Sequence, residues 1–145
     1  MKPLLAIPKI ERVTHAVALY LAARPDLDVN QAEAHVLTFL HLHDDARIND
    51  IHAEFGHRRS TLTSVLDRLE ARGLVERAPD ADNRRSVVVS LTPSGATLSA
   101  RIYDALREIE AAALRGCPAT DLAAFSRVID RLTSGMENRR RSVGH

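Results

Sequence analysis

The chain has 145 residues, of which 45% are hydrophobic and 27% are charged, and its formal net charge is +1. This composition suits one soluble globular domain or one protomer, and it excludes disorder throughout. The near-neutral charge excludes a broadly basic chain, so any affinity for nucleic acid must come from local placement. The single cysteine, Cys117, excludes an intramolecular disulfide framework and fits a reducing cytoplasm. No apolar run of about 18 residues occurs, so no membrane span is expected.

The first 43 residues are predicted to form an arm and two helices. Residues 1–8 are apolar but are broken by two prolines, and we expect them to pack on a partner as an arm. Lys9 to Arg24 has apolar residues on one side and is followed by a proline, which predicts a helix. Asn30 with Glu33 three residues later resembles a capping box, and it predicts a second helix to about His43.

The middle of the chain reads as helix, turn and helix. Residues 44–46 are expected to turn the chain into a short helix over Ile48 to Phe55, which Asn49 can cap. Gly56 and His57 are interpreted as a tight turn, and a second helix is predicted from Arg58 to Arg72.

Side chains of this second helix separate into two faces at about 100° per residue. Leu62, Val65, Leu66 and Leu69 are predicted to point inward. The opposite face is small and polar, and it fits the major groove of DNA, which is about 12 Å wide. It consists of Ser60, Ser64 and Asp67, with Thr63 and Arg68 at its edges. An ordinary amphipathic surface helix is the alternative.

A hairpin with an arginine-bearing loop is predicted next. Gly73 is expected to end the helix as a left-handed cap, and strands are predicted at 74–77 and 86–91. The loop between them, residues 78–85, holds Arg84 and Arg85, and a guanidinium at such a tip suits the negative potential of a narrow minor groove. Asp80 or Asp82 is a candidate for holding that arginine in position. The alternative is a solvated hairpin loop.

The residues over this stretch resemble the winged-helix core of the MarR family of transcriptional regulators. The resemblance is carried by Ser60-Thr61-Leu62-Thr63, by Leu66 through Arg77, by Asp80 through Arg85 and by Val89 through Gly95. It covers about a third of the chain at motif level. It implies a homodimer whose second motif helix enters the major groove and whose wing enters the minor groove, with small ligands weakening DNA binding. Ser64 departs from the family, in which a longer polar or basic residue is frequent, and Ser60 is an alternative cap for a later helix start.

Two long helices are predicted after the hairpin. Thr92 and Pro93 signal a start, and the helix is expected to run to about Arg115, where residues 116–118 break it. Thr120 is expected to cap a last helix to about residue 138. Both helices carry apolar stripes, so we expect a dimer to bury them, with an intramolecular helical hairpin as the alternative.

The fold class expected is mainly α with a small β-wing. Residues 30–91 form the winged helix-turn-helix DNA-binding core, residues 1–29 and 92–138 form a helical dimerisation region, and residues 139–145 form a tail. The function expected is a homodimeric regulator that binds a pseudo-palindromic DNA duplex and is released by a small molecule or another signal. A winged helix used for protein contact is the alternative.

Nine residues are expected to contact DNA. Four are expected at bases or nearby phosphates, with Arg68 the candidate for guanine: Thr61, Thr63, Ser64 and Arg68. Three are expected at phosphates, and they are Arg59, Ser60 and Arg77. The last two, Arg84 and Arg85, are alternatives for the minor groove.

Other chemistry has weaker support in the sequence. The resemblance implies an effector site between the dimer helices and the winged core, with His15, Tyr20, His35 and Phe39 as candidates. The histidines are too widely spaced for a usual zinc site, so no metal or other cofactor is expected, although a metal- or redox-sensing member of the family is an alternative. No catalytic triad order and no phosphate-binding glycine loop is found, so an enzyme is not expected.

Overall fold

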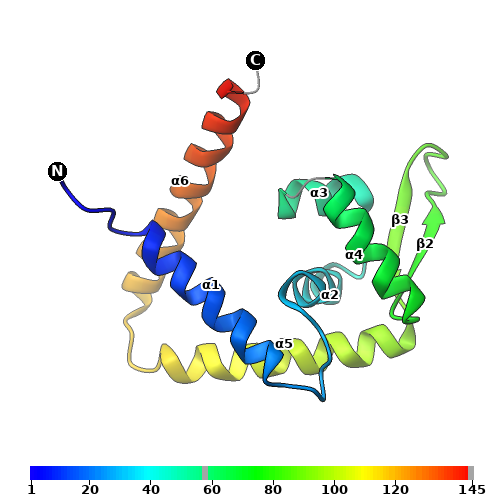
Figure 1. Cartoon of the computed structure of the whole chain (residues 1–145), viewed down its shortest axis with the longest axis horizontal. Coiled ribbons are helices and arrows are strands. Elements are labelled where there is room, and N and C mark those ends of the chain that lie inside the picture. The colour runs from blue at the N-terminus through cyan, green and yellow to red at the C-terminus, as the bar shows by residue number, and fades with distance from the viewer. Residues whose placement is uncertain (57–58, 144–145) are drawn as a thin grey trace. The chain divides into compact units, whose positions relative to one another are not determined.

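The computed structural model describes residues 1–56 and 59–143. These residues contain six α-helices and one three-stranded antiparallel sheet (Figure 1). The chain divides into two compact units, residues 1–107 and residues 108–145. The expected mainly α class with a small β-wing is confirmed.

The first helix, α1, spans Ile7–Ala22, which is two residues earlier at each end than predicted. Pro8 was interpreted as a break before the helix, but it lies in the first turn, where a proline costs no hydrogen bond because those N–H groups have no helical partner. Leu21 is buried, whereas Ile10 and Val13 remain exposed. The apolar stripe of α1 is therefore only partly covered by this unit.

The second helix, α2, spans Gln31–His43 and begins with the predicted capping box. The Asn30 side chain accepts a hydrogen bond from the Glu33 N–H, and the Glu33 carboxylate accepts one from the Asn30 N–H. Val36, Leu37 and Leu40 are buried on its inner face. A cap of this kind stabilises a helix by about 1 kcal/mol.

A short strand precedes the helix-turn-helix, where only a turn was predicted. This strand, β1, spans Asp45–Arg47 and leads directly into α3, Ile48–Phe55. The expected cap at Asn49 is wrong, because α3 begins at Ile48, as predicted, with Arg47 at its N-cap and Asn49 inside its first turn. Gly56 ends α3 in the left-handed conformation, at φ 58°. His57 and Arg58, which carried the rest of the predicted turn and the predicted helix start, lie outside the described residues.

The fourth helix, α4, spans Arg59–Ala71, so Ser60 lies inside it and Arg72 lies beyond it. All four side chains predicted to point inward are buried, and they are Leu62, Val65, Leu66 and Leu69. Gly73 adopts φ 69° and donates its N–H to the Glu70 carbonyl, which confirms the left-handed cap. The core of this unit thus fixes which face of α4 stays outside.

The wing consists of β2, Val75–Pro79, and β3, Val87–Leu91, paired antiparallel (Figure 1). The strand order is β1-β3-β2, with Ala46 opposite Val89 on one side of β3 and Arg77 opposite Val89 on the other. The first strand of the hairpin, β2, was predicted to end at Arg77, but it continues to Pro79. Pro79 is tolerated because β2 is an edge strand of the sheet.

The fifth helix, α5, spans Pro93–Ala113, two residues shorter at its end than predicted. The Thr92 hydroxyl accepts a hydrogen bond from the Gly95 N–H, which confirms Thr92 as its cap. Gly95 is buried against the backbone of Leu74, at the start of the wing. Ile102 is fully buried in the core of the first unit.

The second unit contains the end of α5 and the last helix, α6, which spans Ala119–Val143. Thr120 lies inside α6 and does not cap it, because the Pro118 carbonyl accepts from the N–H groups of Asp121 and Leu122. Residues 139–143, predicted as a tail, continue the helix. Within residues 119–143 no side chain is buried, and the exposed fraction of Phe125 is 65%.

Candidate nucleic-acid interface

The outer face of α4 is short-chained and polar, as predicted. Ser60, Thr61, Thr63 and Ser64 are all exposed, and the Ser64 hydroxyl donates to the Ser60 carbonyl at 3.0 Å. This hydrogen bond to the preceding turn holds the short Ser64 side chain against the helix backbone. Arg59, at the start of the helix, is exposed as well. The face is therefore slim enough for α4 to lie deep in a groove.

Arg68 lies at the edge of this face and is held from the side by α2. Its Nε donates to the Glu33 carboxylate at 3.1 Å, and half of its side-chain surface remains exposed. No local pattern indicates this contact, because the two residues are 35 positions apart.

Arg77, expected at a phosphate, binds two acidic side chains of α4. Its Nη2 donates to the Asp67 carboxylate at 2.6 Å, and its Nε donates to Glu70. These carboxylates raise the pKa of Arg77, with Asp67 the larger cause and burial opposing both. The pairs attach the first wing strand to α4 and partly neutralise the guanidinium that was expected to face DNA.

The loop of the wing is ordered by Asp80, which is only 8% exposed. One carboxylate oxygen accepts from the Asp82 N–H at 3.0 Å, and the other accepts from the Nε of Arg47 at 2.7 Å. The Asp82 N–H is the larger cause of a lowered Asp80 pKa, and the Arg47 hydrogen bond adds to it while burial opposes both. Asp80 and Asp82 were the two candidates for holding a loop arginine; for Asp80 this is wrong, because the arginine it binds is Arg47 of β1.

Arg84 and Arg85 are exposed at the tip of the wing. The loop beneath them is closed by hydrogen bonds from the Ser86 N–H to the Asn83 carbonyl and from the Arg85 N–H to the Asn83 side chain. Both arginines are thus presented to solvent on a backbone that Asn83 and Asp80 fix. A cationic tip of this kind is suited to a minor groove.

The four candidate effector residues lie on two helices, His15 and Tyr20 on α1 and His35 and Phe39 on α2. His35 and Phe39 meet Phe55 of α3 edge to face, with ring centroids 3.9 and 5.7 Å apart. His15 is exposed on α1, and the Tyr20 hydroxyl accepts from Arg24 at 2.6 Å. The structure therefore places two of the four in an aromatic contact between α2 and α3.

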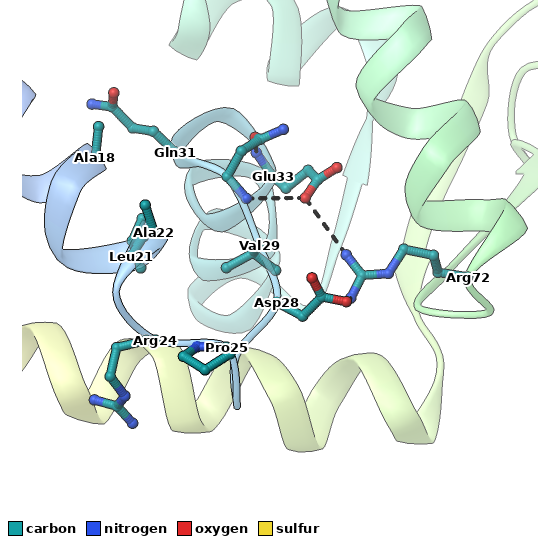
Figure 2. A pocket seen from close by; sticks show the side chains of 11 residues that line it. Ala18, Leu21, Ala22, Arg24, Pro25, Asp28, Val29, Gln31, Glu33 and Arg72 are labelled. Carbon is teal, nitrogen blue, oxygen red and sulfur yellow. Dashed lines mark hydrogen bonds and ion pairs between the residues drawn. The ribbon is translucent and has the colours of Figure 1, made fainter.

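A cavity of about 670 Å³ lies elsewhere, where the end of α1, the start of α2 and Arg72 meet (Figure 2). Its apolar wall includes Leu21 and Val29, and its polar wall includes Asp28, Glu33 and Arg72. None of the four candidate effector residues lines it. The sequence could not indicate this cavity, because its walls come from three separate segments.

Within the part of the chain that the structure describes, no three His, Cys, Asp or Glu side chains gather as metal ligands do. Cys117 is exposed and is not in a disulfide. The described helices include none with the length and apolar character required to cross a bilayer.

The arrangement of α3, α4 and the β2–β3 hairpin defines a winged helix-turn-helix protein. The family model of the MarR family matches residues 29–87. Residues 29–87 therefore form a MarR family winged-helix region, as the sequence resemblance indicated.

Relatives and solved structures agree with this assignment. The chain is 36% identical over 78 residues to the uncharacterized HTH-type transcriptional regulator YfiV of Bacillus subtilis, covering 54% of this chain and 49% of the relative. It is 31% identical over 80 residues to the HTH-type transcriptional repressor NicR of Pseudomonas putida, covering 55% and 51%. These matches thus span about half the length of both relatives.

Two solved structures show the same fold. MepR of S. aureus, crystallised in a DNA-binding conformation, aligns with a TM-score of 0.82 at 20% identity, covering 92% of this chain and 99% of that one. A mutant MarR from E. coli, complexed with operator DNA, aligns with a TM-score of 0.70 at 22% identity, covering 87% and 89%. At these identities the likeness concerns the fold.

Proposed function

We propose that the chain is a sequence-specific, double-stranded DNA-binding transcriptional regulator. The observation that carries this is the exposed hydroxyl-lined face of α4, in the same unit as a wing whose tip exposes two arginines. A slim polar helix fits the major groove, and a guanidinium fits the adjacent minor groove. Both features belong to the matched family region or border on it.

The contacts proposed follow from where the side chains lie. Thr61, Thr63, Ser64 and Arg68 meet bases or nearby phosphates, while Arg59 and Ser60 hold phosphates. Arg77 contacts a phosphate only with the part of its guanidinium that Asp67 and Glu70 leave exposed. Arg84 or Arg85 enters the minor groove.

We expect the protein to act as a homodimer on a pseudo-palindromic site. Large apolar side chains stay exposed on α1 and along α6, among them Val13 at 65% and Phe125 at 65%. Leu4 and Leu5 of the N-terminal arm are exposed too. A second copy would bury this surface, and two-fold symmetry places two reading helices on half-sites about 34–36 Å apart.

The regulator is proposed to act in the cytoplasm as a repressor that a small molecule or another signal releases. Repression is supported by the relative NicR, which is a repressor and shares 31% identity over its matched region. A small-molecule signal acts by binding more tightly to dimers with one spacing of the two reading helices, and so shifts the population of dimers toward that spacing. His15, Tyr20, His35 and Phe39 remain candidates for an effector site completed in the dimer.

The test is a fluorescence anisotropy titration against duplex DNA from the region upstream of the gene, repeated at several salt concentrations. A DNA reader should lose affinity linearly in log salt, with a slope of about −0.9 per phosphate neutralised. Arg84→Ala should weaken binding, whereas a protein-contact module would bind no duplex selectively and lose nothing through this substitution. The same titration with organic acids, oxidants and zinc added tests release by a signal.

A further inference from the structure

Glu33 is a buried carboxylate at the start of α2, with an exposed fraction of 6%. One of its oxygens closes the capping box by accepting from the Asn30 N–H at 3.1 Å. A carboxylate this buried is costly unless it is both hydrogen-bonded and paired with a cation. The cap satisfies part of that requirement, and a cation must supply the rest.

The cations come from α4 and the residue after it, one helical turn apart. Arg68 donates its Nε to one Glu33 oxygen at 3.1 Å, and Arg72 lies 3.5 Å from the other through its Nη1. Figure 2 shows the guanidinium of Arg72 between Glu33 and Asp28, whose carboxylate is 3.5 Å from Nη2. Glu33 therefore joins the start of α2 to the outer edge of the reading helix.

The two arginines play different parts. Arg72 lies past the end of α4 and completes the neutralisation of Glu33. Arg68 lies beside the polar face of α4, and half of its side-chain surface remains exposed while its Nε is held. An arginine side chain carries about 2 kcal/mol of rotamer entropy. A partner on Nε removes part of that freedom before any DNA arrives, and so lowers the cost of binding.

We propose that Glu33 is a positioning residue for sequence readout: it holds Arg68 by Nε so that the exposed part of the guanidinium meets a base pair in a fixed orientation. This rests on the proposed function, because it assumes that α4 reads DNA. Glu33 touches no DNA itself. Its effect is on selectivity between sequences, since a guanidinium held in one plane can make the paired contacts that distinguish guanine.

The experiment measures selectivity as a ratio of two affinities. The probes are a duplex selected by the wild-type protein from a random-sequence library and the unselected library itself. Glu33→Gln removes one negative charge near the DNA, so electrostatics alone would raise both affinities and leave their ratio nearly unchanged. Loss of positioning instead lowers the ratio, by about tenfold if one good base contact is lost.

Two further variants separate positioning from folding. Asn30→Ala removes the other half of the same capping box without changing charge or touching Arg68, so it should lower the melting temperature and leave the ratio unchanged. Arg68→Lys keeps the positive charge but removes both the Nε donor and the exposed guanidinium, so it should lower the ratio at least as much as Glu33→Gln does. The double variant should lose no more than Arg68→Lys alone, because Glu33 acts on selectivity only through the Arg68 guanidinium.

The outcomes are distinct. A wild-type protein that selects no duplex overturns the proposed function and this inference with it. A wild-type protein that selects a duplex, combined with an unchanged ratio for Arg68→Lys or for folded Glu33→Gln, overturns the positioning role of Glu33 alone. Should Glu33→Gln fail to fold, Glu33→Asp decides, because it keeps the charge but draws the carboxylate back from Arg68 by one methylene; an unchanged ratio for Glu33→Asp would overturn the positioning role.

Discussion

Gly95 gives the sharpest test of how the wing is attached to the rest of the unit. It lies in the first turn of α5 and is buried against the backbone of Leu74, where the chain leaves α4 for the wing. A Cβ added at Gly95 would overlap the Leu74 carbonyl oxygen and would lie 2.8 Å from its carbonyl carbon. The same carbonyl accepts from the Thr92 N–H at 3.1 Å. Gly95→Ala therefore forces apart two backbone segments that are hydrogen-bonded to each other nearby.

The expected cost follows from two opposing effects. Overpacking in a filled core costs about 1–3 kcal/mol and more where backbone must move. Replacing glycine by alanine in a helix returns about 1 kcal/mol. Because the atoms in the way belong to backbone, we expect the upper part of the first range, and hence a net loss of about 2 kcal/mol. For a chain of this size that lowers the melting temperature by about 4–8 °C.

The assay is thermal and urea unfolding of the wild type and two glycine variants at one protein concentration, because a dimer's stability depends on concentration. Gly135→Ala is the matched control: Gly135 lies in α6, and nothing lies within 4 Å of its added Cβ. The control should gain up to about 1 kcal/mol. If Gly95→Ala were as stable as the wild type, the close packing of α5 on Leu74 described above would be wrong.

Three further predictions concern the cap and the wing. Asn30→Ala should lower the free energy of unfolding by about 1 kcal/mol in urea titrations, and an unchanged value would contradict the capping box. The pKa of Asp80 is lowered, so its charge adds stability above its ordinary pKa of about 3.9 and this contribution is lost as pH falls through the lowered pKa. We expect the free energy of unfolding of Asp80→Asn, measured between neutral and acid pH, to lack that part of the pH dependence. A pH profile identical to that of the wild type would contradict this role of Asp80. Arg84→Ala should weaken binding about tenfold on duplexes with A·T-rich flanks and less on others, whereas equal losses in anisotropy titrations would make Arg84 a plain phosphate contact.

Local patterns in the sequence predicted the helix-turn-helix and the wing well. The apolar spacing of Leu62, Val65 and Leu69 fixes one face of α4, because side chains along a helix repeat every 3.6 residues whatever surrounds them. Gly73 and Thr92 mark ends of elements for an equally local reason, since each satisfies backbone groups within its own turn or the next. The exposure of the hydroxyl-bearing side chains follows from the same periodicity.

Strand pairs and ion pairs between residues far apart in the sequence were not predicted, or were predicted wrongly. β1 has only three residues, and it is a strand because β3 offers its edge to it, not because of its own composition. Asp80 or Asp82 was expected to hold an arginine of their own loop, but Asp80 accepts from Arg47, which is 33 positions away in the sequence.

The sequence by itself determined which residues of α4 and the wing face outward, since that depends on helical and strand periods and on turn residues close by. The tertiary structure alone decided what those outward residues are bound to. Arg68 is attached to Glu33, Arg77 to two acids of α4, and the cavity beside Arg72 closes from three segments. The physical reason is that a charge finds its partner by distance in space, and no local pattern encodes which distant carboxylate the folded core will bring within reach.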